Sequence, residues 1–310
     1  MRNKLLFFLF ALFVNKVSFS QSIYEFLELD NSARTGALAG SFVSNNDDPN
    51  VIFYNPAGLG LLTENPISIS YVDHLLDINL ASLAYSTEIE GIGRIGAALK
   101  YINYGDFIKA NEDGEITGSF SAGEVAFVLG YANTLDENFY YGINGKVIYS
   151  SIAGYSSTGL AADFGLHYAF PESEFDIGFA ILNAGTQLSA YENTKESLPL
   201  DIVFGASKRL AHLPLRLSLD FHKLNEERDD LGSKFRAFTV GAEFILSKAL
   251  RLRLGYDNEK RKELKIGTTS GLGGLNIGVG LVISKYNFDY GFSSMGEVGG
   301  LHRISISTSL

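Results

Sequence analysis

The sequence contains no cysteine and no tryptophan, and only 6 of its 310 residues are proline. The absence of cysteine excludes disulfide bonds, a thiolate nucleophile and cysteine-ligated zinc. Charged residues make up 19% of the chain, below the roughly 25% that is usual for soluble proteins. With 25 Lys and Arg against 35 Asp and Glu, the net charge is −10, which argues against sequence-independent nucleic-acid binding. Beyond residue 20, no apolar run approaches the ~20 residues that a membrane helix needs.

Glycine and two aromatic residue types are abundant instead. The chain has 33 Gly, 23 Phe and 16 Tyr, a composition that favours strands and turns. Its mean hydropathy is slightly positive, at +0.09. A slightly apolar chain of this kind, without spanning helices, fits a membrane β-barrel better than a soluble enzyme.

Residues 1–20 have the pattern of a secretory signal peptide. Arg2 and Lys4 form a cationic start, and the apolar run from Leu5 to Val14 is too short to span a bilayer. Ser18 and Ser20 are small residues at the positions that precede a cleavage site. The alternative is a membrane-anchoring helix, which the short run disfavours. Export of a cysteine-free chain indicates the bacterial envelope.

Strict alternation of apolar and polar residues predicts strands with one apolar face. The apolar residues are Leu, Tyr and Phe in the segments 215–222, 250–257 and 286–293, and Ile in the terminal segment 303–310. A soluble β-sandwich also alternates, so this pattern alone does not select a membrane barrel. On the polar face of these segments lie six charged residues expected to point into a lumen: Arg216, Asp220, Arg251, Arg253, Asp289 and Arg303.

The connections between the predicted strands favour the barrel. We expect about fourteen strands between residues 66 and 310, with long loops after odd-numbered strands and short turns after even-numbered ones. The long loops are expected at 106–119, 188–199, 225–234, 258–273 and 294–300. Short periplasmic turns and long outer loops are typical of outer-membrane barrels. The predicted fold is therefore an all-β, transmembrane, antiparallel β-barrel over residues 66–310, located in the outer membrane.

Residues 21–65 lack the alternation of a barrel wall. They are rich in apolar and small residues at helix-like spacing, and they contain the turn-forming run Asn55-Pro56-Ala57-Gly58-Leu59. We predict that this segment plugs the barrel lumen. The alternative is a flexible periplasmic tail, but disordered segments are usually poorer in apolar residues.

No residue pattern indicates catalysis. The five histidines are far apart in sequence, without the spacing of a helical metal site. Serine-containing runs such as 154–158 lack the nucleophile elbow of hydrolases, and the glycine-rich run 271–278 opens a strand and not a helix. We therefore expect neither an enzyme, nor a bound cofactor, nor a metal.

For the six inward charges, a network that braces barrel and plug is favoured over a selectivity ring.

Several segments resemble one family of outer-membrane barrels. Ser32-Ala33-Arg34 and the run that follows to Gly40, the acidic pair Asp47-Asp48, and Asn55 to Leu59 look like the N-terminal region of the PorV/PorQ family and of the wider FadL-type long-chain fatty-acid transporters. Within that group, the segments 101–120 and 198–219 are most similar to the PorQ-type members. One departure is Ala39, where relatives often carry a second glycine.

This resemblance implies a component of the type IX secretion system of Bacteroidota. It implies a fourteen-stranded FadL-like barrel in the attachment complex, which anchors a PorZ-like surface protein and works with a PorU-like sortase and a PorV-like shuttle. The alternative that the wider family implies is a FadL-type transporter of hydrophobic small molecules. Transport needs an apolar lumen pocket, whereas the predicted inward faces are polar, and this contrast favours the anchor.

The long outer loops are the expected docking surface for a surface partner. A barrel held in lipid meets such a partner through its outer rim, and mixed charges there favour electrostatic orientation. The alternative is that these charges are merely solvated. The candidate residues are Glu226, Glu227, Asp229, Asp230, Lys260, Arg261 and Lys262.

Overall fold

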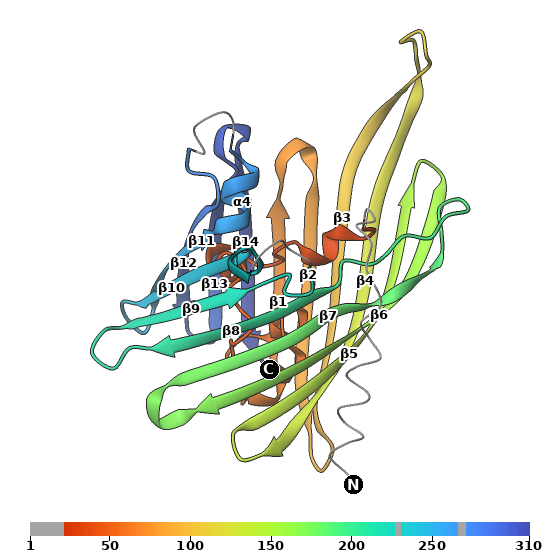
Figure 1. The fold of residues 1–310 in the computed structure, drawn as a ribbon. Coiled ribbons are helices and arrows are strands. Elements are labelled where there is room, and N and C mark those ends of the chain that lie inside the picture. The colour runs from red at the N-terminus through yellow and green to blue at the C-terminus, as the bar shows by residue number, and fades with distance from the viewer. Residues whose placement is uncertain (1–21, 227–230, 266–270) are drawn as a thin grey trace.

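The computed structural model describes residues 22–226, 231–265 and 271–310. Fourteen antiparallel strands form one closed barrel, so the predicted fold class and strand number are confirmed (Figure 1). The strands are β1 (Pro66–Asp73), β2 (Asn79–Ile89), β3 (Gly93–Ala110), β4 (Ile116–Asp136), β5 (Phe139–Ile152), β6 (Tyr155–Phe170), β7 (Phe175–Ser189), β8 (Asp201–Arg209), β9 (Leu215–Phe221), β10 (Phe238–Ile245), β11 (Leu250–Asp257), β12 (Leu275–Ile283), β13 (Tyr286–Ser294) and β14 (Gly300–Ser309).

Within the described residues, the helices are short, and none of them forms part of the barrel wall. Those with α-helical geometry are α2 (Ala33–Ala37), α3 (Leu231–Lys234) and α4 (Asn258–Glu263). The 3-10 turns are η2 (Glu25–Glu28), η3 (Pro49–Phe53), η4 (Pro56–Leu61), η5 (Leu75–Asp77), η6 (Pro171–Ser173) and η7 (Gly296–Val298). Over the described ranges, none of the helices has the length and apolar character required to cross a membrane.

Each strand pairs with its sequence neighbours, and β1 closes the barrel against β14. The closing register runs from Pro66 opposite Ser309 to Asp73 opposite His302. Connections after even-numbered strands are tight and define what we call the turn end. The opposite end, the upper end in Figure 1, carries the connections after odd-numbered strands and is called the loop end.

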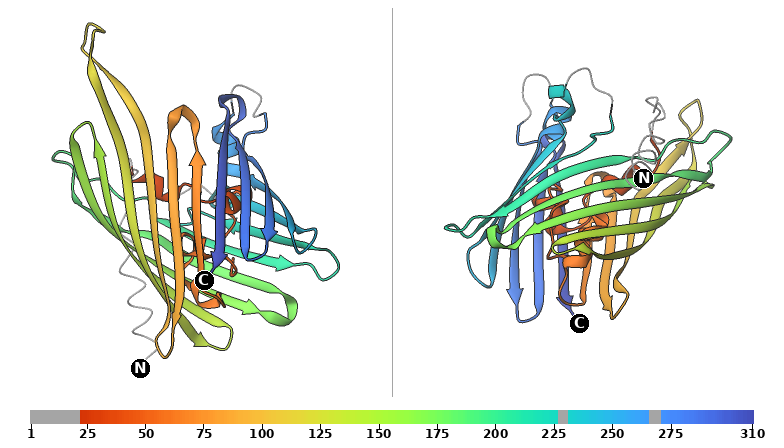
Figure 2. Two further views of the ribbon diagram at one scale, coloured as in Figure 1. Left: turned by 180° about the vertical axis from the view of Figure 1, so that it is seen from behind. Right: turned by 60° about the horizontal axis from the view of Figure 1, so that its bottom comes forward.

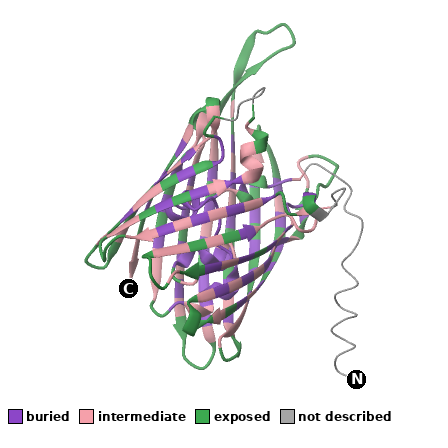
Figure 3. Ribbon diagram, turned by 60° about the vertical axis from the view of Figure 1, so that its left-hand side comes forward, coloured by how far each residue is buried: buried purple, intermediate pink, exposed green. Residues whose placement is uncertain are grey.

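Burial alternates along the strands, as the sequence pattern predicts. In β14, Arg303 and Ser305 are buried while Ile304 and Ile306 are exposed, and the same banding covers the barrel (Figure 3). The outer surface is therefore apolar: Leu129 is 68% exposed and Leu254 is 51% exposed. Because a closed barrel pairs every strand on both sides, this surface exposes few free backbone groups.

One expected loop proved to be a strand ribbon. The segment 106–119 was predicted to be a loop, but β3 extends to Ala110 and β4 begins at Ile116, beyond the end of β2. Phe107 and Phe120 lie opposite each other and stack with ring centroids 5.1 Å apart. This cross-strand pair stabilises a two-stranded ribbon that projects past the barrel wall at the loop end (Figures 1 and 2).

Candidate functional site

Residues 22–65 thread through the inside of the barrel from one end to the other (Figure 2). Ser22 pairs with Ser197 in the β7–β8 connection at the loop end. At the turn end, the carbonyl of Asn65 accepts a hydrogen bond from the backbone of Leu310. The segment packs its own apolar side chains, including Phe42 and Leu59, against small inward residues of the wall. This placement is consistent with the predicted lumen plug, and the segment is called the plug from here on.

Helix α2 seats the first part of the plug against the strands that close the barrel. The Ser32 hydroxyl accepts from the backbone of Thr35, and the two residues form a capping box at the helix start. The Ala33 amide donates to Ser305 Oγ in β14 over 2.7 Å. A Cβ on Gly255 or Gly291 would overlap the backbone of α2, so glycine at these wall positions permits the close approach.

Arg34 is the centre of a buried ion-pair network. Its guanidinium lies 2.8 Å from Asp47, 3.4 Å from Asp48 and 2.9 Å from Glu243 in β10. Three carboxylates surround this one guanidinium, and their negative charge compensates the burial of the cation. The structure thus brings three of the plug residues singled out by the family resemblance, Arg34, Asp47 and Asp48, into one cluster.

The network continues into the barrel wall through charges expected to face the lumen. Arg253 lies 2.8 Å from Glu243 and also binds Asp289, while Arg216 lies 3.0 Å from Asp47. Asp220 accepts from the backbone amides of Phe42 and Val43, which holds the next turn of the plug. Arg251 is half-buried beside this network and makes no ion pair within the described part of the chain.

The Asn55–Leu59 motif is the second anchor of the plug. Asn55 caps η4 and donates from Nδ2 to the carbonyls of Val43, at 2.8 Å, and Leu166, at 3.0 Å. It thereby joins the plug to itself and to β6. Pro56 and Ala57 lie directly against Gly142 of β5, where any side chain would overlap their backbone.

The expected docking residues are only partly described. Glu227, Asp229 and Asp230 lie outside the described residues, and Glu226 precedes that gap. On α4, Lys260 Nζ lies 3.3 Å from Asp257 and 3.6 Å from Asp30, and Arg261 donates to carbonyls of the β11–β12 connection. Lys262 is exposed. Lys260 and Arg261 therefore contact groups of this chain.

A pocket at the loop end is a feature that the sequence did not indicate. It lies between the plug, the β1–β2 connection, α4 and the strands β12–β14, and encloses about 60 Å³. Its apolar lining includes Leu29, Val72, Leu80, Met295 and Leu301. Its polar lining includes Asp30, His74, Lys260, Asn276, Ser293 and Arg303. The lining residues come from seven separate segments of the chain, so only closure of the barrel brings them together.

Ala39 stands where relatives often carry a glycine, and its backbone conformation is one that favours glycine. Ala39 and Gly40 both adopt left-handed backbone conformations, with φ of 56° and 73°. Because a Cβ disfavours this region, Ala39→Gly should stabilise the protein by about 0.5–1 kcal/mol. Urea unfolding in lipid vesicles measures the change. The matched control Ala37→Gly, inside α2, should destabilise it, and destabilisation by both variants would contradict the strain argument.

The chain resembles the toluene transporter TbuX of Ralstonia pickettii (14% identity, TM-score 0.63, covering 92% of this chain and 99% of that one). It also resembles the toluene transporter TodX of P. putida (12% identity, TM-score 0.58, 92% and 99% covered) and a Pseudomonas aeruginosa FadL homologue (9% identity, TM-score 0.57, 90% and 98% covered). No protein-family model and no curated protein matches the sequence.

These likenesses concern the class of fold, which is a closed antiparallel β-barrel. More particularly, the fold is that of the FadL-type barrels. At 9–14% identity the likeness concerns architecture and not chemistry.

Proposed function

We propose that this protein is an outer-membrane channel of the FadL type, which admits small hydrophobic molecules at its loop end. The observation that carries the proposal is the largely apolar pocket formed there by Leu29, Val72, Leu80 and Leu301 against the plug. The polar inward faces predicted from the sequence favour an anchor, whereas this pocket adds an apolar recess of about 60 Å³ at the loop end, with the kind of lining that hydrophobic ligands contact. The fold likeness to the transporters of toluene supports the same function.

The proposed entry route runs from the pocket into the barrel and is closed by the plug. Buried plug residues such as Phe42, Val51 and Leu59 are at most 1% exposed, and they fill the middle of the lumen. Passage therefore requires part of the plug to move. The segment next to the pocket, residues 29–30, is held by a few polar contacts, including those of Asp30 with Tyr54 and Lys260.

Toluene uptake tests the proposed function. Cells that lack their own hydrocarbon channels and express this protein should take up labelled toluene faster than cells with an empty vector. Leu80→Trp fills the pocket and should lower uptake several-fold. The matched control Leu83→Trp lies on the exposed face of the same strand and should leave uptake unchanged. Uptake equal to the empty-vector rate would contradict the proposal.

The proposed membrane location yields a second prediction. Leu219 is 40% exposed on the outer face of β9, and its neighbour Ser218 faces inward. Leu219→Arg places a charge in lipid and should destabilise the barrel by about 2–4 kcal/mol near the membrane midplane. Ser218→Arg should cost less. The folded fraction of each variant is measured by its heat-modifiable mobility on a gel. Equal assembly of the two variants would refute the assignment of Leu219 to the outer face and Ser218 to the inner face.

A second candidate function is the attachment of a surface partner, as in the type IX secretion system. The β3–β4 ribbon favours it, because Ile108 and Ile116 are 70% and 72% exposed beyond the barrel wall. A PorZ-like protein would dock there, with PorU-like and PorV-like proteins completing the complex. Replacing residues 106–119 by a tight turn should release the partner into the medium while the barrel stays folded. If the partner remains cell-attached, the ribbon is not its dock.

A further inference from the structure

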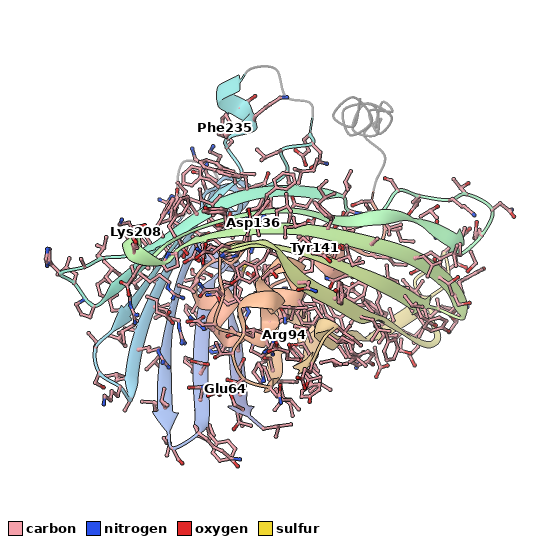
Figure 4. All side chains as sticks on the ribbon, turned by 90° about the horizontal axis from the view of Figure 1, so that it is seen from below. Glu64, Arg94, Asp136, Tyr141, Lys208 and Phe235 are labelled. Carbon is pink, nitrogen blue, oxygen red and sulfur yellow. The ribbon has the colours of Figure 1, made fainter. Side chains whose placement is uncertain are left out.

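The short connections at the turn end carry charges that are sorted by sign. The turns after β2, β4 and β6 lie in residues 86–93, 134–139 and 170–175, which contain no Lys or Arg. The turns after β8, β10 and β12 lie in residues 207–215, 245–250 and 282–287, which contain no Asp or Glu. We call the first set the acidic rim and the second set the basic rim. The acidic rim carries Glu88, Glu90, Asp136, Glu137, Glu172 and Glu174, and the basic rim carries Lys208, Arg209, Lys248 and Lys285. Figure 4 views the molecule from this end and labels Asp136 and Lys208, one from each rim.

The two rims lie on nearly opposite sides of the barrel. Each strand is hydrogen-bonded to its neighbours in sequence, so the position of a turn around the wall follows the strand number. The middle turn of the acidic rim follows β4, and the middle turn of the basic rim follows β10, six strands further around a ring of fourteen. The barrel therefore has a negative side and a positive side at one and the same end.

Where the two rims adjoin, oppositely charged turns already pair. Arg209 Nη1 lies 3.7 Å from Glu174 Oε1, and the Arg209 amide donates to the Glu174 carbonyl over 3.0 Å. This contact joins the turn after β8 to the turn after β6 within one chain. A direct contact between a basic and an acidic turn is thus compatible with the backbone geometry of both.

The charges at the centre of each rim lack such a partner in the described part of the chain. Asp136, Glu137 and Lys248 are exposed, and none of them forms an ion pair with another described residue. The Asp136 carboxylate accepts only from the backbone amide of Glu137, over 2.8 Å. These charges are available to a second molecule.

A second copy of the chain fits both rims at once. The membrane gives neighbouring copies the same orientation, so their rims stand at the same height. Turns recur at every second strand in both rims, which gives both the same spacing of roughly 10 Å. The basic rim of one copy can then face the acidic rim of the next, with Lys248 toward Asp136 and Glu137. This match of sign, height and spacing favours a copy of the same chain over an unrelated protein.

We infer that copies of this protein associate side by side in the membrane, with the basic rim of one copy against the acidic rim of the next. Such a contact joins different surfaces of two copies, so every pair still exposes one free rim of each sign and the assembly extends as a row. Exposed ion pairs each contribute little stability, and the charges mainly select which faces meet. The inference depends on the membrane location and not on transport.

Cross-linking between single-cysteine variants tests the inference, because the chain itself has no cysteine. Leu135→Cys lies on the acidic rim and Ala249→Cys on the basic rim; both residues are exposed, and both changes keep every rim charge. The two variants, with different affinity tags, are co-expressed and treated in intact outer membranes with a short bismaleimide. The mixed pair should cross-link at least fivefold more than either variant with itself. Equal cross-linking of all pairs indicates random collision, and preferred cross-linking of like variants indicates a two-fold contact. Either result overturns the inference.

Charge reversal locates the contact on the basic rim. Lys208→Glu together with Lys285→Glu leaves this rim without net charge and should lower the mixed cross-linking at least fivefold. The matched control, Lys262→Glu with Lys265→Glu, changes the net charge equally at exposed positions of the loop end and should leave the cross-linking unchanged. Heat-modifiable gel mobility verifies that each barrel is folded. Equal effects of the two reversals would overturn the inference.

Salt gives a measurement that needs no charge variant. Raising the ionic strength from 0.1 to 1 M shortens the screening length from ~10 to ~3 Å, so the preference for the mixed pair should disappear. A preference that persists in 1 M salt would mean that contacts other than the rim charges select the faces.

A row also predicts assemblies larger than pairs. A chain with both Leu135→Cys and Ala249→Cys should form a ladder of cross-linked trimers and larger species, because its two thiols lie on nearly opposite sides of one barrel. A ladder that ends at dimers overturns the inference. Cross-linking only to proteins of other mass also overturns it and would assign the rims to a different partner. None of these measurements involves transport, so their failure leaves the proposed channel function untouched.

Discussion

Replacement of Arg34 by methionine should destabilise the protein by about 3 kcal/mol. The change removes the cation that lies between Asp47, Asp48 and Glu243, and breaking a buried ion pair by removing one partner costs ~3–5 kcal/mol. We expect the lower part of this range, because Glu243 keeps Arg253 and Asp47 keeps Arg216. Urea unfolding in lipid vesicles gives the change in free energy of unfolding.

Arg251→Met is the control for this prediction. Arg251 lies on β11 near the same network, but the described chain gives it no ion pair, so its loss should cost less than ~1 kcal/mol. Equal effects of the two replacements would mean that net lumen charge, and not the contacts of Arg34, determines stability.

Substitution of Gly142 by leucine should dislodge the turn-end half of the plug. Any Cβ at this position overlaps the backbone of Pro56 and Ala57, which cannot move aside as a flexible side chain could. Overpacking of this kind costs ~1–3 kcal/mol or more. The barrel wall does not depend on the contact, so we expect a folded barrel with raised ion conductance across a planar bilayer.

Gly145→Leu provides a matched control on the same strand. Gly145 is exposed on the outer face of β5, and a Cβ there meets no atom within 4 Å. This variant should conduct like the unmodified protein. A closed Gly142→Leu barrel with normal stability would show that the plug can shift without opening a path.

The barrel could be predicted from the sequence because the alternation of apolar and polar residues along each strand reflects the environments on its two faces. A residue in a barrel wall faces either the interior or the exterior, so the alternation in β9, β11 and β13 predicts both the strand and its inward face. The same argument failed for the β3–β4 ribbon. Beyond Asn103 the strand no longer separates two environments, and what stabilises it there is the contact between Phe107 and Phe120 across the hairpin.

The candidate site was predictable only where residues act locally. Alternation assigned Arg303 to the interior, where it is buried, but the pocket that it lines could not be inferred. That pocket depends on which strands become neighbours and in which register. Similarly, Arg34 was singled out by resemblance, whereas its partner Glu243 lies 209 positions away in the chain. Such pairs have no signature in a single sequence.

The packing of α2 against β14 couples the folding of the plug to closure of the barrel. The amide of Ala33 bonds to Ser305, 272 positions later, and Gly36 lies against Arg303 on the same final strand. The earliest part of the plug therefore has no complete binding surface until the last strand pairs with the first. Contacts so distant in sequence carry a large loop-closure entropy and form slowly. We expect seating of the plug and sealing of the β1–β14 seam to occur as one late, cooperative kinetic step.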